Sequence, residues 1–118
     1  MCGIAGIVDG EHRMKYRNQQ AVEEMLDTMK RRGPDQQKIY TDEAVTLLHA
    51  RLSVMDLQHG KQPMQLKSDP RYVMVYNGEL YNTEELRREL QKKGYAFQET
   101  SDTEVLLQAF IEWKETVV

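Results

Sequence analysis

The chain has 118 residues with a formal net charge of −3, and 40% of its residues are hydrophobic and 30% charged. This balance fits one globular domain and excludes a disordered chain, while the acidic charge disfavours a nucleic-acid partner. No apolar run reaches the about 20 residues of a membrane span, and no secretory signal is visible, so we expect a cytoplasmic protein without membrane contact.

The first half of the chain predicts a short buried strand over residues 1–8 and a helix over residues 19–32. The helix has one apolar face, formed by Val22, Met25, Leu26 and Met29. Lys30–Arg32 fall in its last predicted turn, where cations suit the helix dipole. Gly33 and Pro34 then predict its end.

Strands are predicted over residues 44–49, 52–56 and 72–76, with a turn at residues 60–63 between them. The YVMVY stretch at 72–76 is a strong strand signal, because valine and tyrosine are enriched in strands.

A second helix is predicted over residues 82–93, with Asn82 and Glu85 as a capping box and Gly94 as its end. A short strand is predicted over residues 95–98. This interleaving of helices with runs of strands favours an α+β fold with antiparallel sheet over a doubly wound parallel fold.

Ser101 and Glu104 predict another capping box, which opens a third helix. Its buried face is predicted to contain Val105, Leu106, Ala109, Phe110 and Trp113. Neither Gly nor Pro follows this helix before Val118, so we expect the natural polypeptide to continue.

Cys2 is the only cysteine, which excludes an internal disulfide and a cysteine-rich zinc site. Removal of the initiator Met would leave a free α-amino group beside the Cys2 thiol. The reference pKa of that amine, about 7.7–8.0, leaves a useful fraction of neutral base near pH 7. The amine can take the thiol proton directly or through one water and so generate a thiolate nucleophile. The alternative is a small apolar residue that packs at a strand start.

The opening residues MCGIAGIV resemble the start of class II glutamine amidotransferases, whose glutaminase domain uses an N-terminal nucleophile. Further stretches agree with that family in order and spacing. They are RGPD at 32–35, HARLSVMDL at 49–57, GKQPM at 60–64, and VYNGELYN at 75–82 followed by SDTE at 101–104. Any one motif is weak, but together they cover nearly the whole chain and are specific.

Within that superfamily the same stretches resemble the glutamine-hydrolysing asparagine synthases. The resemblance implies the fold of N-terminal-nucleophile hydrolases, a four-layer α/β/β/α sandwich with antiparallel sheets. Residues 1–118 are shorter than this glutaminase domain. We therefore expect a partial domain with an incomplete sandwich, which turns over glutamine poorly when it is isolated.

The resemblance implies a role for each residue that matches a family motif. Cys2 is the expected nucleophile, with its own α-amino group as base. Asn77 and Gly78 are expected to form the oxyanion hole through the Asn side-chain amide and the Gly backbone N–H. Arg51 is the expected clamp on the substrate α-carboxylate. The other expected substrate-binding residues are Leu52, Ser53, Val54 and Met55, which line the pocket, and Glu79 and Asp102, which receive the α-ammonium group.

These residue types suit the substrate. Free glutamine is a zwitterion, so its recognition needs a cation and an anion a few ångströms apart. The guanidinium of Arg51 offers a rigid two-pronged donor for a carboxylate, and Asp102 favours an ammonium group. Two fixed donors stabilise the negative oxygen of a tetrahedral intermediate, and the loss of one such donor costs about 2.7–4 kcal/mol.

Several of these residues also have a purely structural interpretation. Asn77-Gly78 is the strongest hairpin-turn dipeptide, Arg51 is compatible with a surface charge, and Asp102 with an N-terminal helix charge. The histidines His12, His49 and His59 lack the spacing of metal ligands, so no metal site is expected. The basic residues Arg87, Arg88, Lys92 and Lys93 are interpreted as a solvated helix face.

The resembled family couples glutamine hydrolysis to a second domain that activates aspartate with ATP and passes ammonia to it. That domain needs a Ser-Gly-Gly-x-Asp-Ser type loop, and these 118 residues contain none. We expect L-glutamine as substrate, no cofactor in this chain, and ATP and Mg bound by a synthetase domain of the same polypeptide. A homodimer is left open.

Two alternatives to an asparagine synthase glutaminase are kept. One is the glutaminase domain of another class II amidotransferase with a different ammonia acceptor. The other is a truncated, non-catalytic relative that serves as an interaction module. The intact expected site residues favour an enzyme.

Overall fold

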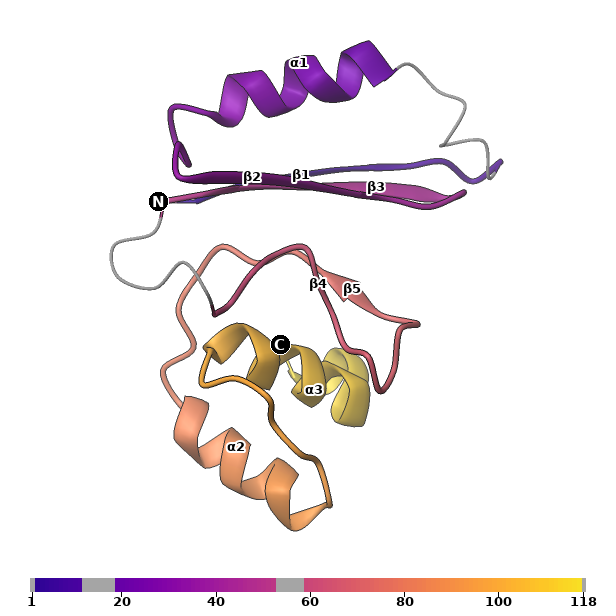
Figure 1. Cartoon of the computed structure of the whole chain (residues 1–118). Coiled ribbons are helices and arrows are strands. Elements are labelled where there is room, and N and C mark those ends of the chain that lie inside the picture. Colours follow the sequence, from indigo (N-terminus) through magenta and orange to yellow (C-terminus); the bar gives the residue numbers. More distant parts are fainter. Residues whose placement is uncertain (1, 12–18, 53–58, 118) are drawn as a thin grey trace. The chain divides into compact units, whose positions relative to one another are not determined.

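The computed structural model describes residues 2–11, 19–52 and 59–117 and divides the chain into two compact units (Figure 1). The sheet unit contains the described residues up to Leu52 together with Val75–Asn77. The helical unit contains the remaining described residues. Each unit is treated by itself.

A three-stranded antiparallel sheet forms the sheet unit, with strand order β1-β3-β2 (Figure 1). Strand β1 spans Gly3–Val8, β2 spans Gln36–Thr41 and β3 spans Val45–Arg51. The predicted N-terminal strand is confirmed over Gly3–Val8, but its predicted burial is wrong, because only Gly3 is buried and Ile4 and Val8 are exposed. The central strand, β3, carries the buried side chains of Thr46, Leu48 and His49.

Helix α1, Gln19–Met29, lies along one face of this sheet (Figure 1). The four predicted apolar residues are its half-buried ones, which confirms the predicted face. The helix ends at Met29, whose carbonyl accepts hydrogen bonds from the N–H groups of Arg32 and Gly33 at 2.9 and 3.1 Å. The prediction that Lys30–Arg32 occupy the last helical turn is wrong, because this tighter turn has already ended the helix.

Strand β2 was not predicted. Its sequence, QQKIYT, contains only two apolar residues and no clear alternation. The strand forms because its backbone pairs with β3 along its whole length. Tertiary pairing, and not local sequence pattern, therefore determines that this segment is a strand.

The predicted strand 44–49 extends through Arg51 as part of β3, so the predicted break before Leu52 is wrong. Leu52 itself lies outside any strand. Residues 53–56 of the predicted strand 52–56 lie outside the described residues.

The helical unit begins with two short strands, β4 at Met64–Gln65 and β5 at Val73–Met74, which pair antiparallel. The strand predicted over residues 72–76 is therefore confirmed only at its centre. The predicted turn at 60–63 precedes β4, and Gly60 there has φ 66°. Only a residue without a side chain adopts that backbone conformation readily.

Helix α2 spans Thr83–Lys92 and ends before Gly94, whose φ of 96° confirms its predicted role. The predicted capping box is wrong, because the Asn82 side chain makes no capping hydrogen bond. Asn82 has φ −100° and ψ 30°, which is not the extended conformation that a capping side chain needs.

Helix α3 spans Asp102–Trp113 and continues into a 3-10 helix, η2, at Lys114–Val117. The hydroxyl of Ser101 accepts a hydrogen bond from the Glu104 N–H at 3.3 Å, which confirms the predicted cap. Of the predicted buried face, Val105 and Ala109 are buried and the other three residues half-buried. Sequence pattern missed further buried residues of α3, which are Thr103, Glu104, Leu107 and Gln108.

The core of the helical unit lies between α2 and α3. Leu90 from α2 and Val105 and Ala109 from α3 are fully buried at its centre. Burial of three such side chains stabilises the pair of helices by several kcal/mol, at about 25 cal/mol per Å² of apolar area. Side chains from both helices and the segments beside them surround this centre.

The strand predicted over residues 95–98 is wrong. Side chains of α3, not a neighbouring strand, satisfy its backbone. The Glu104 carboxylate accepts hydrogen bonds from the N–H groups of Gln98 and Glu99, at 3.0 and 2.7 Å. The Gln108 amide donates to the Ala96 carbonyl at 2.9 Å. An irregular segment results, because these partners follow no strand register.

The described residues thus form an α+β chain with antiparallel sheets, as predicted. Within the described ranges, no helix is long and apolar enough to cross a membrane.

Candidate functional site

Cys2 immediately precedes β1, at the end of the sheet where β3 finishes. The register pairs Gly3 with Ala50, so the next position places Cys2 opposite Arg51. A side chain added at Gly3 would meet Met29 of α1 at 3.3 Å, so Gly3 faces the helix. Because side chains alternate across a strand, Cys2 and Arg51 belong to the opposite face of the sheet.

The Cys2 thiol is half-buried and lies near the first residue after β3. Its Sγ is 3.8 Å from the Leu52 carbonyl oxygen, to which the S–H group can donate a weak hydrogen bond. Residues 50 positions apart in the sequence are brought together by the pairing of β1 with β3. A partly exposed thiol at a strand end is accessible to a small substrate.

Arg51 is half-buried, and its Nη1 atom is buried. The interpretation of Arg51 as a surface charge is therefore wrong. The planar guanidinium presents its N–H donors as a fork, which suits two-pronged recognition of a carboxylate.

The RGPD segment supports the backbone of Arg51. Asp35 N–H donates to the Arg51 carbonyl at 3.0 Å, and Pro34 forms an isolated parallel bridge with Arg51. Gly33 lies so close to β3 that an added Cβ atom would overlap the Ala50 carbonyl group. The RGPD motif is visible in the sequence, but its packing on β3 is not, because local pattern indicates only a helix end at Gly33 and Pro34.

Asn77 belongs to the sheet unit and is exposed. The residue before it, Tyr76, is attached to β3 by a hydrogen bond between its backbone and the His49 imidazole. Three predicted residues, Cys2, Arg51 and Asn77, are therefore placed in one unit with Leu52.

Gly78, Glu79 and Asp102 belong to the helical unit. Gly78 and Glu79 are exposed, and Asp102 is half-buried. The hairpin interpretation of Asn77-Gly78 is wrong, because the dipeptide lies between β5 and α2 and not between two paired strands. Ser53, Val54 and Met55 lie outside the described residues.

Asp102 is the first residue of α3, as its interpretation as an N-terminal helix charge requires. The segment before it is anchored by Glu99, whose carboxylate accepts hydrogen bonds from the Gly60 N–H at 2.8 Å and the Ser101 hydroxyl at 3.0 Å. Beside it, the buried Gln62 side chain lies 3.5 Å from the Thr103 hydroxyl. The position of Asp102 is thus fixed by contacts on both sides.

His49 in β3 has no site role among the sequence predictions, in which its spacing speaks against metal binding. Its side chain is buried, and its Nε2 atom has no hydrogen-bond partner among the described residues. Burial, assisted by the charge of Arg51, lowers the pKa of His49, while the bond to Tyr76 opposes this shift. The described residues contain no group of three His, Cys, Asp or Glu side chains that could hold a metal ion.

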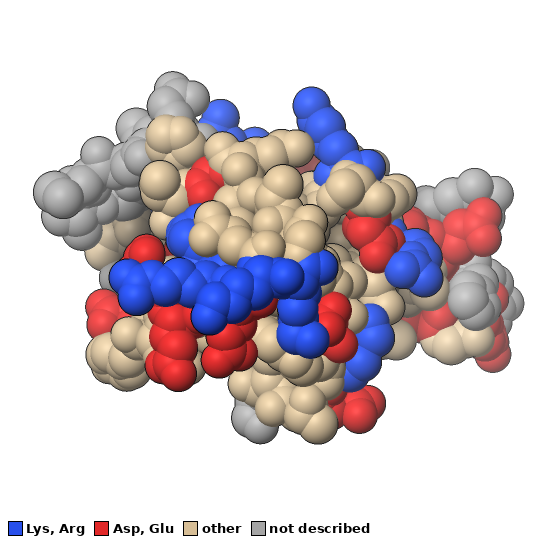
Figure 2. Space-filling view, turned by 90° about the horizontal axis from the view of Figure 1, so that it is seen from below, with Lys and Arg blue, Asp and Glu red and all other residues tan. Residues whose placement is uncertain are grey.

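Charged side chains of both signs lie next to one another on the face of the molecule that Figure 2 shows. In Figure 2, Lys and Arg side chains gather in a row directly beside Asp and Glu. Arg87 lies 3.7 Å from Glu84, and Lys93 lies 3.2 Å from Glu112. Arg88, Lys92 and Lys93 are exposed, as the interpretation of a solvated helix face requires. For Arg87 that interpretation is wrong, because its side chain is only 14% exposed and donates to the Glu99 and Thr100 carbonyls at 3.2 and 3.0 Å.

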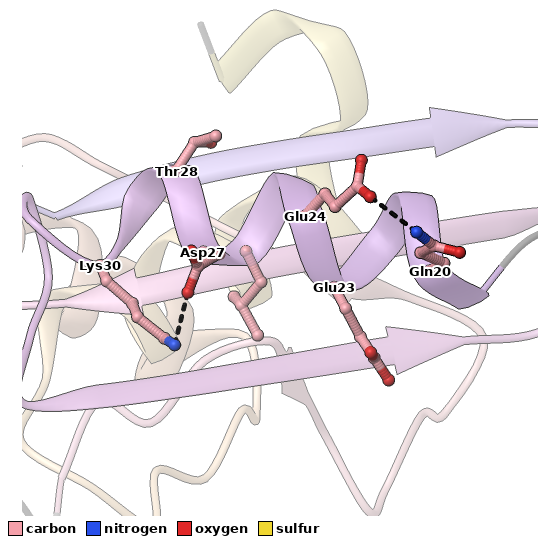
Figure 3. Close-up of a pocket in the computed structure, with 7 residues that line it drawn as sticks. Gln20, Glu23, Glu24, Asp27, Thr28 and Lys30 are labelled. Carbon is pink, nitrogen blue, oxygen red and sulfur yellow. Dashed lines mark hydrogen bonds and ion pairs between the residues drawn. The ribbon is translucent and has the colours of Figure 1, made fainter.

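An open pocket lies along α1, and Figure 3 shows the side chains that line it. Gln20 donates to Glu24 at 3.0 Å, and Lys30 pairs with Asp27 at 2.5 Å. None of the predicted site residues lines this pocket. Its polar side chains pair with close neighbours in the sequence, as is usual on a solvent-exposed helix surface.

A family model described as a glutamine amidotransferase domain matches residues 1–118. The chain is 47% identical to asparagine synthetase [glutamine-hydrolyzing] 3 of Bacillus subtilis, over all of this chain and 19% of the relative. It is 37% identical to asparagine synthetase B [glutamine-hydrolyzing] of Escherichia coli, over 95% of this chain and 20% of the relative. A Zea mays asparagine synthetase [glutamine-hydrolyzing] is 34% identical, over 100% of this chain and 20% of the relative. The chain thus spans about a fifth of the length of these curated relatives.

Proposed function

Because the chain belongs to the family of glutamine amidotransferase domains, we propose that it hydrolyses the side-chain amide of L-glutamine to glutamate and ammonia. One observation carries the proposal. The Cys2 thiol lies 3.8 Å from the Leu52 carbonyl, at the sheet end where Arg51 is held. The proposed nucleophile and the proposed carboxylate-binding cation therefore lie at the same end of one sheet.

Cys2 is the nucleophile of this proposal. Once Met1 is removed, the α-amino group of Cys2 takes the thiol proton and the thiolate attacks the amide carbon of glutamine. The tetrahedral intermediate collapses when the amine returns the proton to the leaving nitrogen, which departs as ammonia. Water then attacks the γ-glutamyl thioester, and the thiol and glutamate are released.

Negative charge develops on the amide oxygen in both attacks. The Asn77 side-chain amide and the Gly78 backbone N–H are the proposed donors to this oxygen. Their exposure in the described chain leaves both donors accessible to a substrate. Fixed donors of this kind are usually the largest single contribution to the rate of acyl transfer.

Charged groups of opposite sign bind the two ends of the amino acid. The Arg51 guanidinium is the proposed partner of the α-carboxylate, and Asp102 with Glu79 is the proposed partner of the α-ammonium group. Leu52, Ser53, Val54 and Met55 are the proposed pocket lining. The partly buried guanidinium of Arg51 supports its part of this assignment.

The proposed architecture is the four-layer α/β/β/α sandwich of N-terminal-nucleophile hydrolases, of which residues 1–118 form a part. Support comes from the face of the sheet opposite α1, where Ile4 is 45% and Val8 79% exposed. A further sheet layer on this face would remove both side chains from water.

The proposed use of the ammonia is ATP-dependent conversion of aspartate to asparagine. The names of the relatives support it, since they are glutamine-hydrolysing asparagine synthetases about five times as long as this chain. ATP and Mg would be bound by a synthetase domain of the same polypeptide. The described residues offer no cluster of metal ligands, so no step of the hydrolysis is assigned to either.

Covalent labelling tests the nucleophile. A diazo-ketone that mimics glutamine should label the peptide that begins with Cys2, and excess L-glutamine should protect it. The matched control is Cys2→Ser, which removes the only thiol of the chain. Intact mass shows in the same experiment whether Met1 has been removed. Absence of label from processed protein at its full natural length would overturn the proposal.

A further inference from the structure

His49 connects two parts of the proposed site. It is 2% exposed and lies in β3, two residues before Arg51. The register places it opposite Ile4, and alternation puts its side chain on the face that Cys2 and Arg51 share. A buried histidine at this place needs a partner for its ring N–H groups.

Tyr76 supplies that partner. The His49 ring is hydrogen-bonded to the Tyr76 backbone, and the bond favours the protonated ring nitrogen, so the acceptor is the Tyr76 carbonyl. Nε2 is buried and has no hydrogen-bond partner among the described residues, which leaves Nδ1 as the donor. The arrangement therefore corresponds to one neutral tautomer, with the proton on Nδ1.

The Tyr76 carbonyl belongs to the peptide group that leads into Asn77. A peptide group is planar, so a fixed carbonyl also fixes the orientation of the Asn77 N–H and Cα. Asn77 follows a segment that has left β5 and belongs to no strand. Its side-chain amide can be a pre-organised donor only if this peptide plane is held.

We propose that His49 is a positioning residue, which donates from Nδ1 to the Tyr76 carbonyl and thereby holds the Asn77 amide where it stabilises the oxyanion formed at Cys2. This inference rests on the proposed glutaminase function. Nothing in it requires His49 to touch the substrate or to exchange a proton with it. Neither sequence spacing nor metal-ligand patterns identify such a role, because it depends on a contact between distant segments.

Two substitutions separate the hydrogen bond from the volume of the ring. His49→Asn keeps an N–H donor at nearly the position of Nδ1, whereas His49→Leu fills similar space without a donor. His59→Asn is the matched control, since His59 is exposed and belongs to the helical unit. All variants are made in the protein at its full natural length.

The variants are expected to differ in the steady-state kinetics of glutamine hydrolysis. In His49→Leu the kcat for glutamine hydrolysis should fall about 10- to 100-fold while KM changes little, because misplaced oxyanion donors affect the transition state and not ground-state binding. His49→Asn should recover most of this loss, and His59→Asn should match the wild type. Alkylation of Cys2 by iodoacetamide needs no oxyanion donor, so its rate should be unchanged in every variant.

Other outcomes overturn the inference. One is a kcat in His49→Leu equal to that of the wild type. Another is a parallel fall of kcat and of the rate of Cys2 alkylation in this variant, because such a fall would mean that His49 has a merely structural role. Should His49→Leu not fold, nitrogen NMR of the wild-type imidazole decides the matter, because an Nε2–H tautomer at pH about 7 contradicts the proposed bond. A wild-type protein without glutaminase activity would instead refute the proposed function itself.

Discussion

Arg51 combines a buried guanidinium nitrogen with a backbone fixed by β3 and the RGPD segment. We predict that Arg51→Lys raises the KM for glutamine about 10- to 100-fold with a smaller effect on kcat, because an ammonium cannot reproduce two parallel bonds to a carboxylate. Steady-state hydrolysis of glutamine measures this. Arg71→Lys is the control, since Arg71 is exposed and pairs only locally with Asp69 at 2.8 Å. An equal KM in Arg51→Lys would remove Arg51 from the proposed site.

His49 also makes a prediction about pH. Burial and the charge of Arg51 lower its pKa below the ordinary value of 6.5. The unfolded chain therefore binds the proton first as the pH falls. The stability associated with neutral His49 is present above about pH 6.5 and is lost as the pH falls from there toward the lowered folded pKa.

The free energy of unfolding in urea, compared at about pH 7.5 and about pH 5.5, tests this. We expect the wild type to lose more stability over this interval than His49→Asn, which has no titrating ring. Equal losses in the two proteins would mean that His49 is not the group responsible.

At the residue scale, the sequence motifs indicated the residue types of the proposed site but not the surroundings of each residue. Cys2, Arg51 and Asn77 could be named because family motifs repeat these residues at fixed spacing. The role of His49 could not, because it depends on burial and on a bond to Tyr76, 27 positions away in the numbering. Local pattern contains no information on such a contact.

Gly33 shows how one element supports another. We predict that Gly33→Ala destabilises the chain by about 1–3 kcal/mol or more, because the added Cβ overlaps the Ala50 carbonyl and the backbone of β3 must move. Gly10→Ala is the matched control, since a Cβ at Gly10 meets nothing within 4 Å. Urea unfolding of both variants measures the difference. Similar stability of the two would contradict the close packing of Gly33 on β3.

The starts of α2 and α3 offer a second matched pair. Ser101 accepts a hydrogen bond from the Glu104 N–H, whereas the Asn82 side chain caps nothing. We predict that Ser101→Ala costs about 0.5–2 kcal/mol of unfolding free energy, while Asn82→Ala costs only a few tenths. Thermal or urea unfolding can rank them. A larger cost at Asn82 would reverse the assignment of the two caps.

At the element scale, periodic patterns predicted the three helices well. They failed for segments whose structure is determined by strand pairing or by hydrogen bonds from distant side chains. Strand β2 has too few apolar residues to be recognised, and it exists because β3 offers an unsatisfied edge. Residues 95–98 have strand-like composition but become irregular, because Glu104 and Gln108 bind their backbone. Both outcomes depend on partners that are remote in sequence or on a later helix.

At the scale of the whole molecule, the sheet has one face covered by α1 and another on which Ile4 and Val8 are exposed. We predict that the 118 residues expressed alone hydrolyse glutamine at least about ten-fold more slowly than the intact Bacillus subtilis relative, because the exposed face with Ile4 and Val8 lacks packing that would hold the proposed site. A parallel ammonia-release assay of the two proteins tests this. Comparable kcat values would show that these residues suffice for the reaction.

The pairing of β1 with β3 also sets an order of events during synthesis. Cys2 is among the first residues to be made, yet Leu52, its neighbour at 3.8 Å, is added 50 residues later. At about 5–20 residues per second, translation leaves this interval at roughly 3–10 s. Strands β2 and β3 are close in sequence and can pair as soon as both emerge, whereas β1 must wait for β3. The thiol that is synthesised first thus remains without its structural setting until β3 has been made, and the ribosome determines how long that lasts.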